Sequence, residues 1–518
     1  MRLSQLLINV PGAPGDFAKD PEISGLSYDS RHAKPGHIFF ALPGTKTDGQ
    51  RFIADAIKNG AVVIISQNQD GKGDAVFIQV PDAREAMAHA AANFYDNPSK
   101  KLKVIGVTGT NGKTTTAWLV SHLMKAGSQH CGLIGTITYD LGGRQIPAPR
   151  TTPEAPDLQE AMHEMLLSRC KACSIEISSH ALAQKRSHAI EFTAAIFTNL
   201  TQDHLDYHGS MENYFEAKTK LFSQLATSGR KGAKAIINSD DRYGHFLLQS
   251  FDKKLKILRY GLGVGNDFRA SNIQSNVLGT QYRLEAKGRE YLVRLPLIGL
   301  FNVYNSLAAL AAVSSAGVEL RRAISALANI PQIPGRLERV PCKRDFQIFV
   351  DYAHTEDALE NVLKSLRELK PRRLICVFGC GGDRDKFKRA HMGSVSEKFA
   401  DFSILTTDNP RSEDPEKILA DISEGMRGRH HEIIPDREKA IFRAVEIAEG
   451  KDIILIAGKG HELYQEIKGE RHPFDDVRVA TWALNDKPSS LPADEDEKPK
   501  FTEHDSHTPE ENSLQNNT

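Results

Sequence analysis

This chain of 518 residues has no excess of positive or negative charge. Lysine and arginine together number 66, aspartate and glutamate also number 66, and the formal net charge at pH 7 is zero. Proteins that bind nucleic acid or an anionic membrane surface usually carry a basic footprint, which this balance does not provide. We therefore expect small-molecule ligands as partners, with no nucleic acid and no membrane.

Cysteine and long apolar runs are also scarce. Six cysteines are too few for a disulfide scaffold in a protein of this size. Cys170 and Cys173 form a lone C-x-x-C pair, for which ordinary reduced thiols are favoured over a zinc or redox site. No apolar run approaches membrane-spanning length, and residues 1–12 lack the long apolar segment of a signal peptide, so they predict a first helix. We expect a cytoplasmic monomer.

The length predicts about three domains, and 40% hydrophobic residues suffice for their cores. Residues 1–98 predict a small α/β domain, with strands at 38–42 and 61–65 and a helix at 49–59. Pro98 and the group Pro331, Pro334 and Gly335 mark boundaries, so residues 99–334 and 335–486 form the second and third domains. The polar composition of residues 487–518 predicts a disordered tail.

One stretch, from Lys103 to Gly127, joins a short apolar strand to a helix through a glycine-rich turn. Such a turn gathers backbone N–H groups at the positive end of the helix dipole. Polyphosphate fits there, because glycine admits the phosphates closely, Lys113 offers a positive charge and a threonine hydroxyl can bind Mg²⁺. The spacing departs from the strict nucleotide-loop pattern, since Val107 stands where that pattern has glycine. Phosphate binding is nevertheless favoured over a plain strand-to-helix turn.

Further polar groups follow in the second domain. A polar loop at 150–154 precedes a helix at 155–168, and a strand at 172–179 carries Glu176 in an apolar run. A buried carboxylate needs a partner, which beside a nucleotide is Mg²⁺ and otherwise a structural salt bridge. After a strand at 194–200, two aspartates and two histidines at 203–208 indicate metal or phosphate chemistry. On the next helix, 211–225, Lys218 and Lys220 by themselves predict solvent-exposed lysines.

The third domain alternates strands and helices, after a β excursion at 265–300 and a helix that opens at 301–305. Its strands are predicted at 347–351, 373–378, 401–406 and 452–457, and each ends in a polar or glycine-rich turn. The carboxyl ends of parallel strands meet at one edge of a sheet, so these four turns predict a second site. The polar loops at 27–31 and 44–49 of the first domain are, taken alone, better explained as ordinary turns.

Several motifs together resemble those of the Mur ligases and the folylpolyglutamate synthases. They are the turn 109–115, the segment 203–209 with Lys218 nine residues beyond it, and the segments 335–338 and 350–355. The segments 29–31, 151–155 and 176–180 are similar to the branch of the family that makes a muramyl tripeptide. Asp408-Asn409-Pro410-Arg411 resembles the signature of members that add meso-diaminopimelate. The resemblance extends from about residue 27 to residue 476.

This resemblance implies an α/β fold of three domains. They are a small N-terminal domain for a uridine nucleotide, a central P-loop ATPase domain with a parallel sheet, and a C-terminal Rossmann-like domain for an amino acid. The implied activity joins meso-2,6-diaminopimelate to UDP-N-acetylmuramoyl-L-alanyl-D-glutamate with ATP, through an acyl phosphate, in peptidoglycan precursor synthesis. The implied cofactor is Mg²⁺.

The resemblance also assigns residues to each ligand. For ATP they are Gly109, Thr110, Asn111, Gly112, Lys113, Thr114, Thr115, Asn302, Arg336 and Asp351. For the uridine nucleotide substrate they are Tyr28, Ser30, Thr45, Lys46, Thr47, Thr151, Thr152, Ser178, Gln184 and Arg186. For diaminopimelate they are Arg384, Asp408, Asn409, Pro410, Arg411, Gly458 and Glu462. The metal ligands are Thr114, Glu176, His204 and a carbamylated Lys218, and the catalytic residues are Lys113, His204 and Lys218.

Three alternatives remain open at this stage. A lysine-adding muramyl ligase is the nearest, and Arg411 speaks against it because a guanidinium suits the second carboxylate of diaminopimelate. A folylpolyglutamate synthase shares the ATP turn, but the first 98 residues and the Thr151-Thr152 loop disfavour it. A nucleotide-gated binding or motor protein without ligase chemistry is the third.

Overall fold

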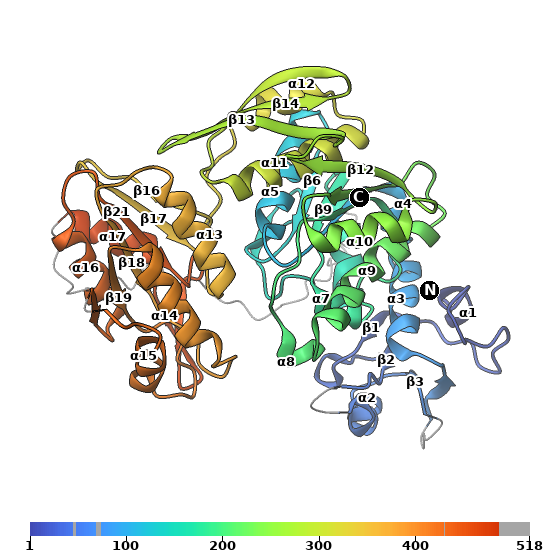
Figure 1. Ribbon diagram of the computed structural model, residues 1–518. Helices are drawn as coiled ribbons and strands as arrows, with labels where there is room; N and C mark the ends of the chain where they lie inside the picture. Colours follow the sequence, from blue (N-terminus) through green and yellow to red (C-terminus); the bar gives the residue numbers. More distant parts are fainter. Residues whose placement is uncertain (45–47, 69–73, 429, 486–518) are drawn as a thin grey trace, which may run out of the picture.

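The structure is a computed structural model that describes residues 1–44, 48–68, 74–428 and 430–485. Its elements gather into three bodies that follow one another along the chain (Figure 1). The predicted nucleotide contacts Thr45, Lys46 and Thr47 and the predicted tail 487–518 lie outside the described residues. No helix of the described part is both long and apolar enough to span a membrane.

The first body is a parallel sheet of order β1-β2-β3-β4 with helices around it. Both predicted strands are confirmed, and the predicted helix at 49–59 is a 3₁₀ turn followed by α2. The predicted first helix is the single turn α1. The elements are α1 (Leu3–Leu6), β1 (Gly25–Ser27), η1 (Ser30–His32), β2 (His37–Phe40), η2 (Gly49–Phe52), α2 (Ile53–Lys58), β3 (Val63–Ser66), β4 (Val76–Gln79) and α3 (Ala83–Phe94).

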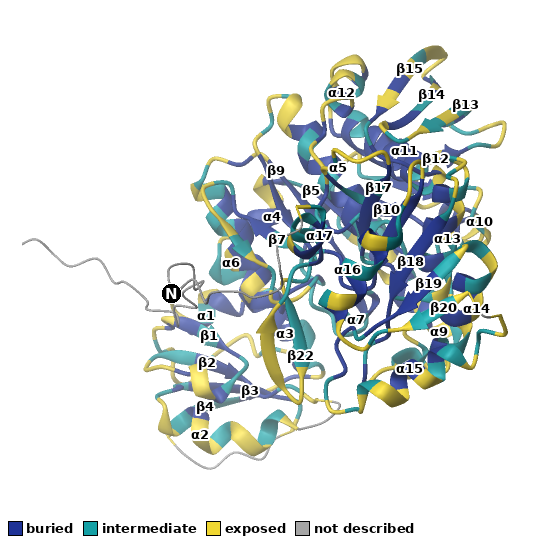
Figure 2. Ribbon diagram, turned by 90° about the vertical axis from the view of Figure 1, so that its left-hand side faces the viewer, coloured by how far each residue is buried: buried dark blue, intermediate teal, exposed yellow. Residues whose placement is uncertain are grey.

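The second body is built on a long sheet of order β15-β14-β13-β12-β11-β10-β5-β9-β6-β7-β8. Its central strands β10, β5 and β9 are parallel and fully buried over most of their length (Figure 2). The first half of this body contains α4 (Pro98–Lys101), β5 (Lys103–Thr108), α5 (Lys113–Ala126), β6 (Cys131–Ile134), β7 (Thr138–Asp140), β8 (Gln145–Pro147), α6 (Ala155–Leu167), β9 (Ala172–Glu176), α7 (Ser179–Ala183) and β10 (Phe192–Phe197).

The second half adds helices around the sheet and extends one of its edges. The predicted β excursion is confirmed as β13, β14 and β15, which are joined as antiparallel pairs. α11 is rich in alanine and leucine and packs against α5 in the core of this body. The elements are α8 (Leu205–His208), α9 (Met211–Thr227), β11 (Lys234–Asn238), α10 (Arg242–Phe251), β12 (Lys256–Gly261), β13 (Phe268–Asn276), β14 (Gly279–Ala286), β15 (Arg289–Leu295), α11 (Leu300–Ser315) and α12 (Leu320–Leu327).

The third body has a six-stranded sheet of order β16-β17-β21-β18-β19-β20 within the described residues. All four predicted strands are present and parallel, with β21 inserted between β17 and β18 although it comes last in the chain. The elements are β16 (Glu338–Val340), β17 (Gln347–Asp351), α13 (Glu356–Arg367), β18 (Leu374–Phe378), α14 (Lys388–Phe399), β19 (Phe402–Leu405), α15 (Pro415–Ser423), β20 (His431–Ile433), α16 (Arg437–Ile447), β21 (Ile453–Ala457), β22 (Tyr464–Ile467), β23 (Glu470–Pro473) and α17 (Asp476–Leu484).

One predicted strand is too long. The strand expected at 172–179 ends at Glu176, and the helix α7 begins three residues later. The cause is Ser178, whose hydroxyl accepts a hydrogen bond from the Ala181 backbone N–H at 3.2 Å and caps the helix. The shorter strand leaves Glu176 at its carboxyl end, beside the turn that precedes α5.

Candidate active site

The strand β5, the turn 109–112 and the helix α5 form the predicted nucleotide turn. Gly109 and Gly112 have φ angles of 145° and 82°, a region that side chains rarely adopt. A Cβ on Gly109 would lie 1.9 Å from Thr198 Oγ1, and one on Gly112 would lie 2.3 Å from Asn305 Oδ1. Both glycines are therefore required by backbone conformation and by their neighbours. The helix ends at Ala126 with Gly127 after it, as predicted.

Lys113, the first residue of α5, folds back over the turn. Its Nζ donates hydrogen bonds to the backbone oxygens of Gly109 and Thr110, at 3.1 and 2.7 Å. Burial lowers the pKa of Lys113, while the charge of Glu176 partly opposes that shift. A cation held on bare carbonyl oxygens gains more from a phosphate than an exposed lysine would, because it has already left water.

Glu176 is fully buried at the end of β9. Its carboxylate accepts hydrogen bonds from Thr114 Oγ1 at 3.0 Å, from the Thr136 backbone N–H at 2.8 Å and from Thr136 Oγ1 at 3.0 Å. No lysine or arginine of the described residues forms an ion pair with it, so the salt bridge considered as an alternative is absent there. A buried carboxylate and a threonine hydroxyl are oxygen ligands of the kind that Mg²⁺ takes.

Lys218 is buried, so the prediction of a solvent-exposed lysine at this position was wrong. It is only 1% exposed, on the inner face of α9, and its Nζ donates to the Gly109 backbone oxygen at 2.7 Å. The ammonium also lies 4.4 Å from the centre of the Tyr214 ring. Burial, and then the charge of Lys113, hold the pKa of Lys218 well below its usual value. Lys220, two residues on, is exposed as predicted.

The segment 203–208 brings its histidines together with His180. The rings of His180 and His204 are 4.8 Å apart and perpendicular, and His208 lies 2.9 Å from the Ser179 hydroxyl. His204 has a φ of 53°, which turns the chain into α8. Burial lowers the pKa of His204 to about 4, although Asp203 at 3.5 Å opposes the shift. A neutral imidazole is the form that binds a metal ion.

Residues of the third body reach the nucleotide turn. Arg336 donates to Thr114 Oγ1 at 3.0 Å, and its guanidinium lies 4.9 Å from the centre of the Tyr352 ring. Asp351, at the end of β17, accepts hydrogen bonds from the backbone N–H groups of Leu337 and Ala353. Arg336 therefore lies at the turn, whereas Asp351 holds the chain around it. Asn302 is buried in α11 and accepts a hydrogen bond from Asn305, the neighbour of Gly112.

The predicted uridine-nucleotide residues that the structure describes line the junction of the first two bodies. Tyr28 donates to Asp157 at 2.6 Å, and Arg186 donates to the Thr152 backbone oxygen at 2.9 Å and to Gln184 at 2.7 Å. The Thr152 hydroxyl donates to the Glu176 backbone oxygen, which ties this junction to the nucleotide turn. The other members are Ser30, which is buried, Thr151, 3.1 Å from Thr136, and Ser178, the cap of α7.

The predicted diaminopimelate residues meet at the carboxyl ends of β18, β19 and β21. Arg411 has a φ of 52°, donates through Nη1 to the Gly382 backbone oxygen at 2.6 Å, and lies 3.3 Å from Glu466 through Nε. Asn409 donates to Glu462 at 2.7 Å. Gly458 has a φ of 112°, which side chains rarely adopt, and a Cβ there would also lie 2.4 Å from Asp408 Oδ2. Pro410 is buried and Arg384 is exposed.

Three residues at these sites escaped the sequence analysis. Asp357, in the first turn of α13, accepts hydrogen bonds from Asn111 at 2.6 Å and Thr201 at 3.1 Å. Lys459 is fully buried and binds Asn409 at 3.0 Å and Glu462 at 3.1 Å, and Glu466 of the hairpin β22–β23 pairs with Arg411. Lys459 lies in the turn after β21, which the sequence predicted as part of the second site without assigning this residue a role. No local signal distinguishes Asp357 or Glu466, because their partners are distant in the sequence.

Comparisons with known proteins agree with this geometry. Three family models match the chain, described as "Mur ligase family, catalytic domain" at residues 22–95, "Mur ligase middle domain" at 107–313 and "Mur ligase, glutamate ligase domain" at 335–460. A relative from Syntrophomonas wolfei, named UDP-N-acetylmuramoyl-L-alanyl-D-glutamate--2,6-diaminopimelate ligase, is 42% identical over 94% of this chain and 100% of its own length.

Solved structures show the same relationship. One, titled as a UDP-N-acetylmuramoyl-L-alanyl-D-glutamate--2,6-diaminopimelate ligase, has 37% identity and a TM-score of 0.66, and the match covers 90% of this chain and 95% of the other. A Mycobacterium tuberculosis folylpolyglutamate synthase complexed with ADP has 20% identity and a TM-score of 0.59 over 72% of this chain and 91% of its own. At that identity the second likeness concerns the fold alone.

Proposed function

The chain belongs to the Mur ligase family, and from this premise we propose that it joins 2,6-diaminopimelate to UDP-N-acetylmuramoyl-L-alanyl-D-glutamate with ATP, in peptidoglycan precursor synthesis. The observation that carries the proposal is the placement of Arg411 at the carboxyl end of β19, in a chain similar over nearly its whole length to ligases of that name. The folylpolyglutamate synthase alternative is disfavoured by its low sequence identity of 20%, against 42% for the diaminopimelate ligase. The lysine-adding alternative is disfavoured by Arg411.

The reaction requires an activated carboxylate, because a free carboxylate does not form an amide with an amine at neutral pH. In-line transfer of the γ-phosphoryl group from ATP to the D-glutamyl carboxylate gives an acyl phosphate and ADP. The incoming amine then attacks the acyl carbon, forms the amide, loses a proton and releases phosphate. Lys113 would neutralise charge on the triphosphate, which otherwise repels the substrate carboxylate.

Magnesium fits the residues around Glu176. The carboxylate is buried without a lysine or arginine partner among the described residues, and the Thr114 hydroxyl is hydrogen-bonded to it. We propose that these two residues hold one Mg²⁺, and that His204 and a modified Lys218 hold a second. A bound Mg²⁺ supplies positive charge against the phosphate oxygens.

Lys218 is suited to carbamylation. Reaction with CO₂ requires the neutral amine, and burial lowers the pKa of this lysine. The carbamate would place an anion close to the Lys113 ammonium, where a second positive charge is disfavoured. Attack of the amine nitrogen on CO₂ forms the N–C bond, and one amine proton leaves to solvent.

Diaminopimelate and the uridine nucleotide would be bound by different sets of side chains, in the third body and in the first two bodies. We propose that the Arg411 guanidinium grips the distal carboxylate of diaminopimelate, beside Arg384, and that Asp408 and Glu462 accept hydrogen bonds from its distal amine. Asn409, Pro410 and Gly458 shape the turn around them. Tyr28, Ser30, Thr151, Thr152, Ser178, Gln184 and Arg186 would contact the uridine nucleotide and its peptide.

The proposal also covers the domain boundaries, the oligomeric state and the cellular location of the protein. We propose domains at 1–98, 99–334 and 335–486, and each matched family model lies inside one of these ranges. We propose a cytoplasmic monomer, since its substrates are cytoplasmic metabolites, with no nucleic acid or membrane partner.

Purified protein with ATP, Mg²⁺ and the UDP-muramyl dipeptide, offered diaminopimelate or lysine, tests the proposal when products are read by mass spectrometry. The expected result is a tripeptide with diaminopimelate and ADP release that requires all three substrates. Tripeptide formation with lysine alone would assign the chain to the lysine-adding branch. Phosphate release without either substrate would indicate a nucleotide-gated binding protein.

A further inference from the structure

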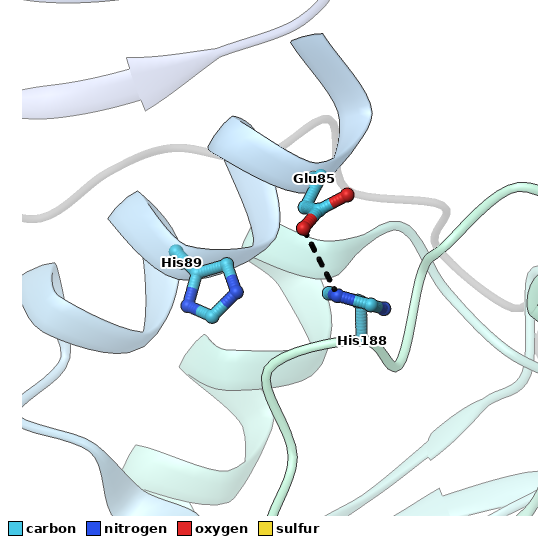
Figure 3. A group of neighbouring side chains, drawn as sticks. All are labelled: Glu85, His89 and His188. Carbon is cyan, nitrogen blue, oxygen red and sulfur yellow. Dashed lines mark ion pairs between the residues drawn. The ribbon is translucent and has the colours of Figure 1, made fainter. Parts of the chain in front are cut away.

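Away from the active site, a group of side chains links the first body to the second. Glu85 and His89 stand one turn apart on α3, and His188 faces them from the loop that follows α7 (Figure 3). One ligand atom from each of the three side chains lies within 4.8 Å of the other two. His188 Nε2 is 3.4 Å from Glu85 Oε1, and the two imidazole rings are 5.6 Å apart.

These distances are close to those of a metal site. Zinc binds imidazole nitrogen and carboxylate oxygen at about 2.0–2.2 Å, so tetrahedral ligands lie about 3.4 Å from one another. The Glu85–His188 separation already has that value, and the ligand nitrogen of His89 lies within 4.8 Å of both other ligand atoms. The three side chains are partly exposed, so an ion can enter and water can complete its coordination.

A second observation comes from Gln224 on α9. Its Nε2 lies 3.5 Å from His188 Nδ1, while its Oε1 is buried and has no hydrogen-bond partner among the described residues. Half a turn of the amide would let Oε1 accept a hydrogen bond from a protonated Nδ1. That tautomer leaves His188 Nε2 unprotonated and directed at Glu85, which is how a second residue commonly orients a metal-binding histidine.

The charges nearby restrict what the group can bind. Lys185 pairs with Glu85 through Oε2 and with Asp82 at 2.9 Å, so it leaves Glu85 Oε1 available. Burial lowers the pKa values of both His89 and His188, which favours the neutral imidazole that binds a metal ion. Two neutral imidazoles and one carboxylate suit zinc and its neighbours in the transition series, whereas Mg²⁺ prefers oxygen ligands alone.

We propose that Glu85, His89 and His188 form a binding site for a transition-metal cation of the zinc class, with Gln224 orienting His188. An ion held there would tie α3 of the first body to the second body. The site is separate from the proposed Mg²⁺ residues and does not depend on the proposed function.

The test uses the full-length protein, freed of metal by a chelator and kept in excess Mg²⁺ so that the active site is occupied. Co²⁺ is titrated and followed by its visible absorption, and Zn²⁺ is titrated by calorimetry. We expect one Zn²⁺ per chain, and an affinity lower by about a hundredfold or more in His89→Ala and in His188→Ala. Gln224→Leu should weaken binding by about 10–100-fold without removing a ligand.

Matched variants separate this site from others. His32→Ala removes an exposed histidine of the first body and should bind Zn²⁺ like the unaltered protein. His204→Ala should also retain the ion, because that residue belongs to the active site. Glu85→Gln preserves size and covers the case in which a histidine variant fails to fold. Absence of binding in the unaltered protein, or unchanged binding in His89→Ala, His188→Ala and Glu85→Gln, would overturn the proposal.

Discussion

Asn111 donates a hydrogen bond from its side-chain amide to Asp357 Oδ2 at 2.6 Å, across 246 residues of sequence. Asn111 belongs to the nucleotide turn, and Asp357 lies in the first turn of α13 in the third body. Thr201 donates to the same carboxylate oxygen. This carboxylate thus joins the third body, where we propose that the amino acid binds, to the turn proposed to bind ATP, and the proposed reaction must bring the two together.

Replacing Asp357 with alanine should loosen this contact. Hydrogen bonds to a charged group contribute about 1.5–3 kcal/mol, so we expect kcat to fall about tenfold or more. Binding of ATP, measured by calorimetry, should change much less, because Asp357 contacts the turn only through side chains. Small-angle scattering should show a larger radius of gyration than in the unaltered protein. An unchanged radius together with unchanged kcat would remove Asp357 from any role in closure.

Arg411→Ala should abolish use of diaminopimelate far more than binding of ATP. Loss of a two-pronged charge pair in a closed site costs about 3–4 kcal/mol, which is a factor of several hundred in kcat/KM for diaminopimelate. Arg411→Lys keeps the charge and loses the planar fork, so it should recover only part of that factor. Arg427→Ala, which removes an exposed positive charge elsewhere in the third body, is the matched control. Equal losses in ATP and diaminopimelate binding would refute the assignment of Arg411.

Gly109→Ala should impair ATP binding. The new Cβ would lie 1.9 Å from Thr198 Oγ1, at a φ of 145° that alanine rarely adopts, so the turn must change shape. We expect ATP affinity to fall about tenfold or more, measured by calorimetry. Gly15→Ala provides the control, since a Cβ there meets no atom within 4 Å. ATP binding as tight as in Gly15→Ala would show that the turn tolerates a side chain.

Removing one partner of the buried ion pair between Arg437 and Asp476 should destabilise the third body more than replacing both partners with apolar residues. Both side chains are 0% exposed, and Arg437 Nε and Asp476 Oδ1 are 2.8 Å apart. Asp476→Ala leaves a buried guanidinium unpaired, at a cost of about 3–5 kcal/mol in the free energy of unfolding. Arg437→Met combined with Asp476→Leu should lose less in urea denaturation than Asp476→Ala. A double variant as unstable as the single one would contradict this account.

His461 should make the third body less stable in acid. Burial, and then Arg336, lower the pKa of His461 from 6.5 to about 3. The unfolded chain therefore binds the proton more readily between these values. Stability from this group is complete above pH 6.5 and is lost as the pH falls towards 3, by about 1.4 kcal/mol for each pH unit at most. His461→Gln should flatten this dependence in urea denaturation at several pH values, and an equally steep dependence would contradict it.

The elements that sequence patterns predicted well are those set by neighbours in the chain. The strand, turn and helix around residues 103–127 were predicted because a short apolar run, glycine and a helical repeat are all local signals. The four strands of the third body followed for the same reason. The overlong strand at 172–179 failed because a serine cap competes with strand extension, which the apolar run did not reveal.

Local pattern and motif were enough to predict three α/β segments and a phosphate-binding turn, and to recognise the Mur ligase family, which the comparisons confirm. Folding alone decided that Lys218 is buried, because only the packing of α9 under the turn brings its ammonium to Gly109 and out of water. The contact of Asp357 with Asn111, and the meeting of Glu85, His89 and His188, likewise depend on elements that pack together from distant parts of the chain. The spacing of residue types along the chain reports on local backbone conformation over a few residues. Contacts between distant segments form when whole helices and sheets bury their apolar faces against one another, and a short stretch of sequence does not show which faces will meet.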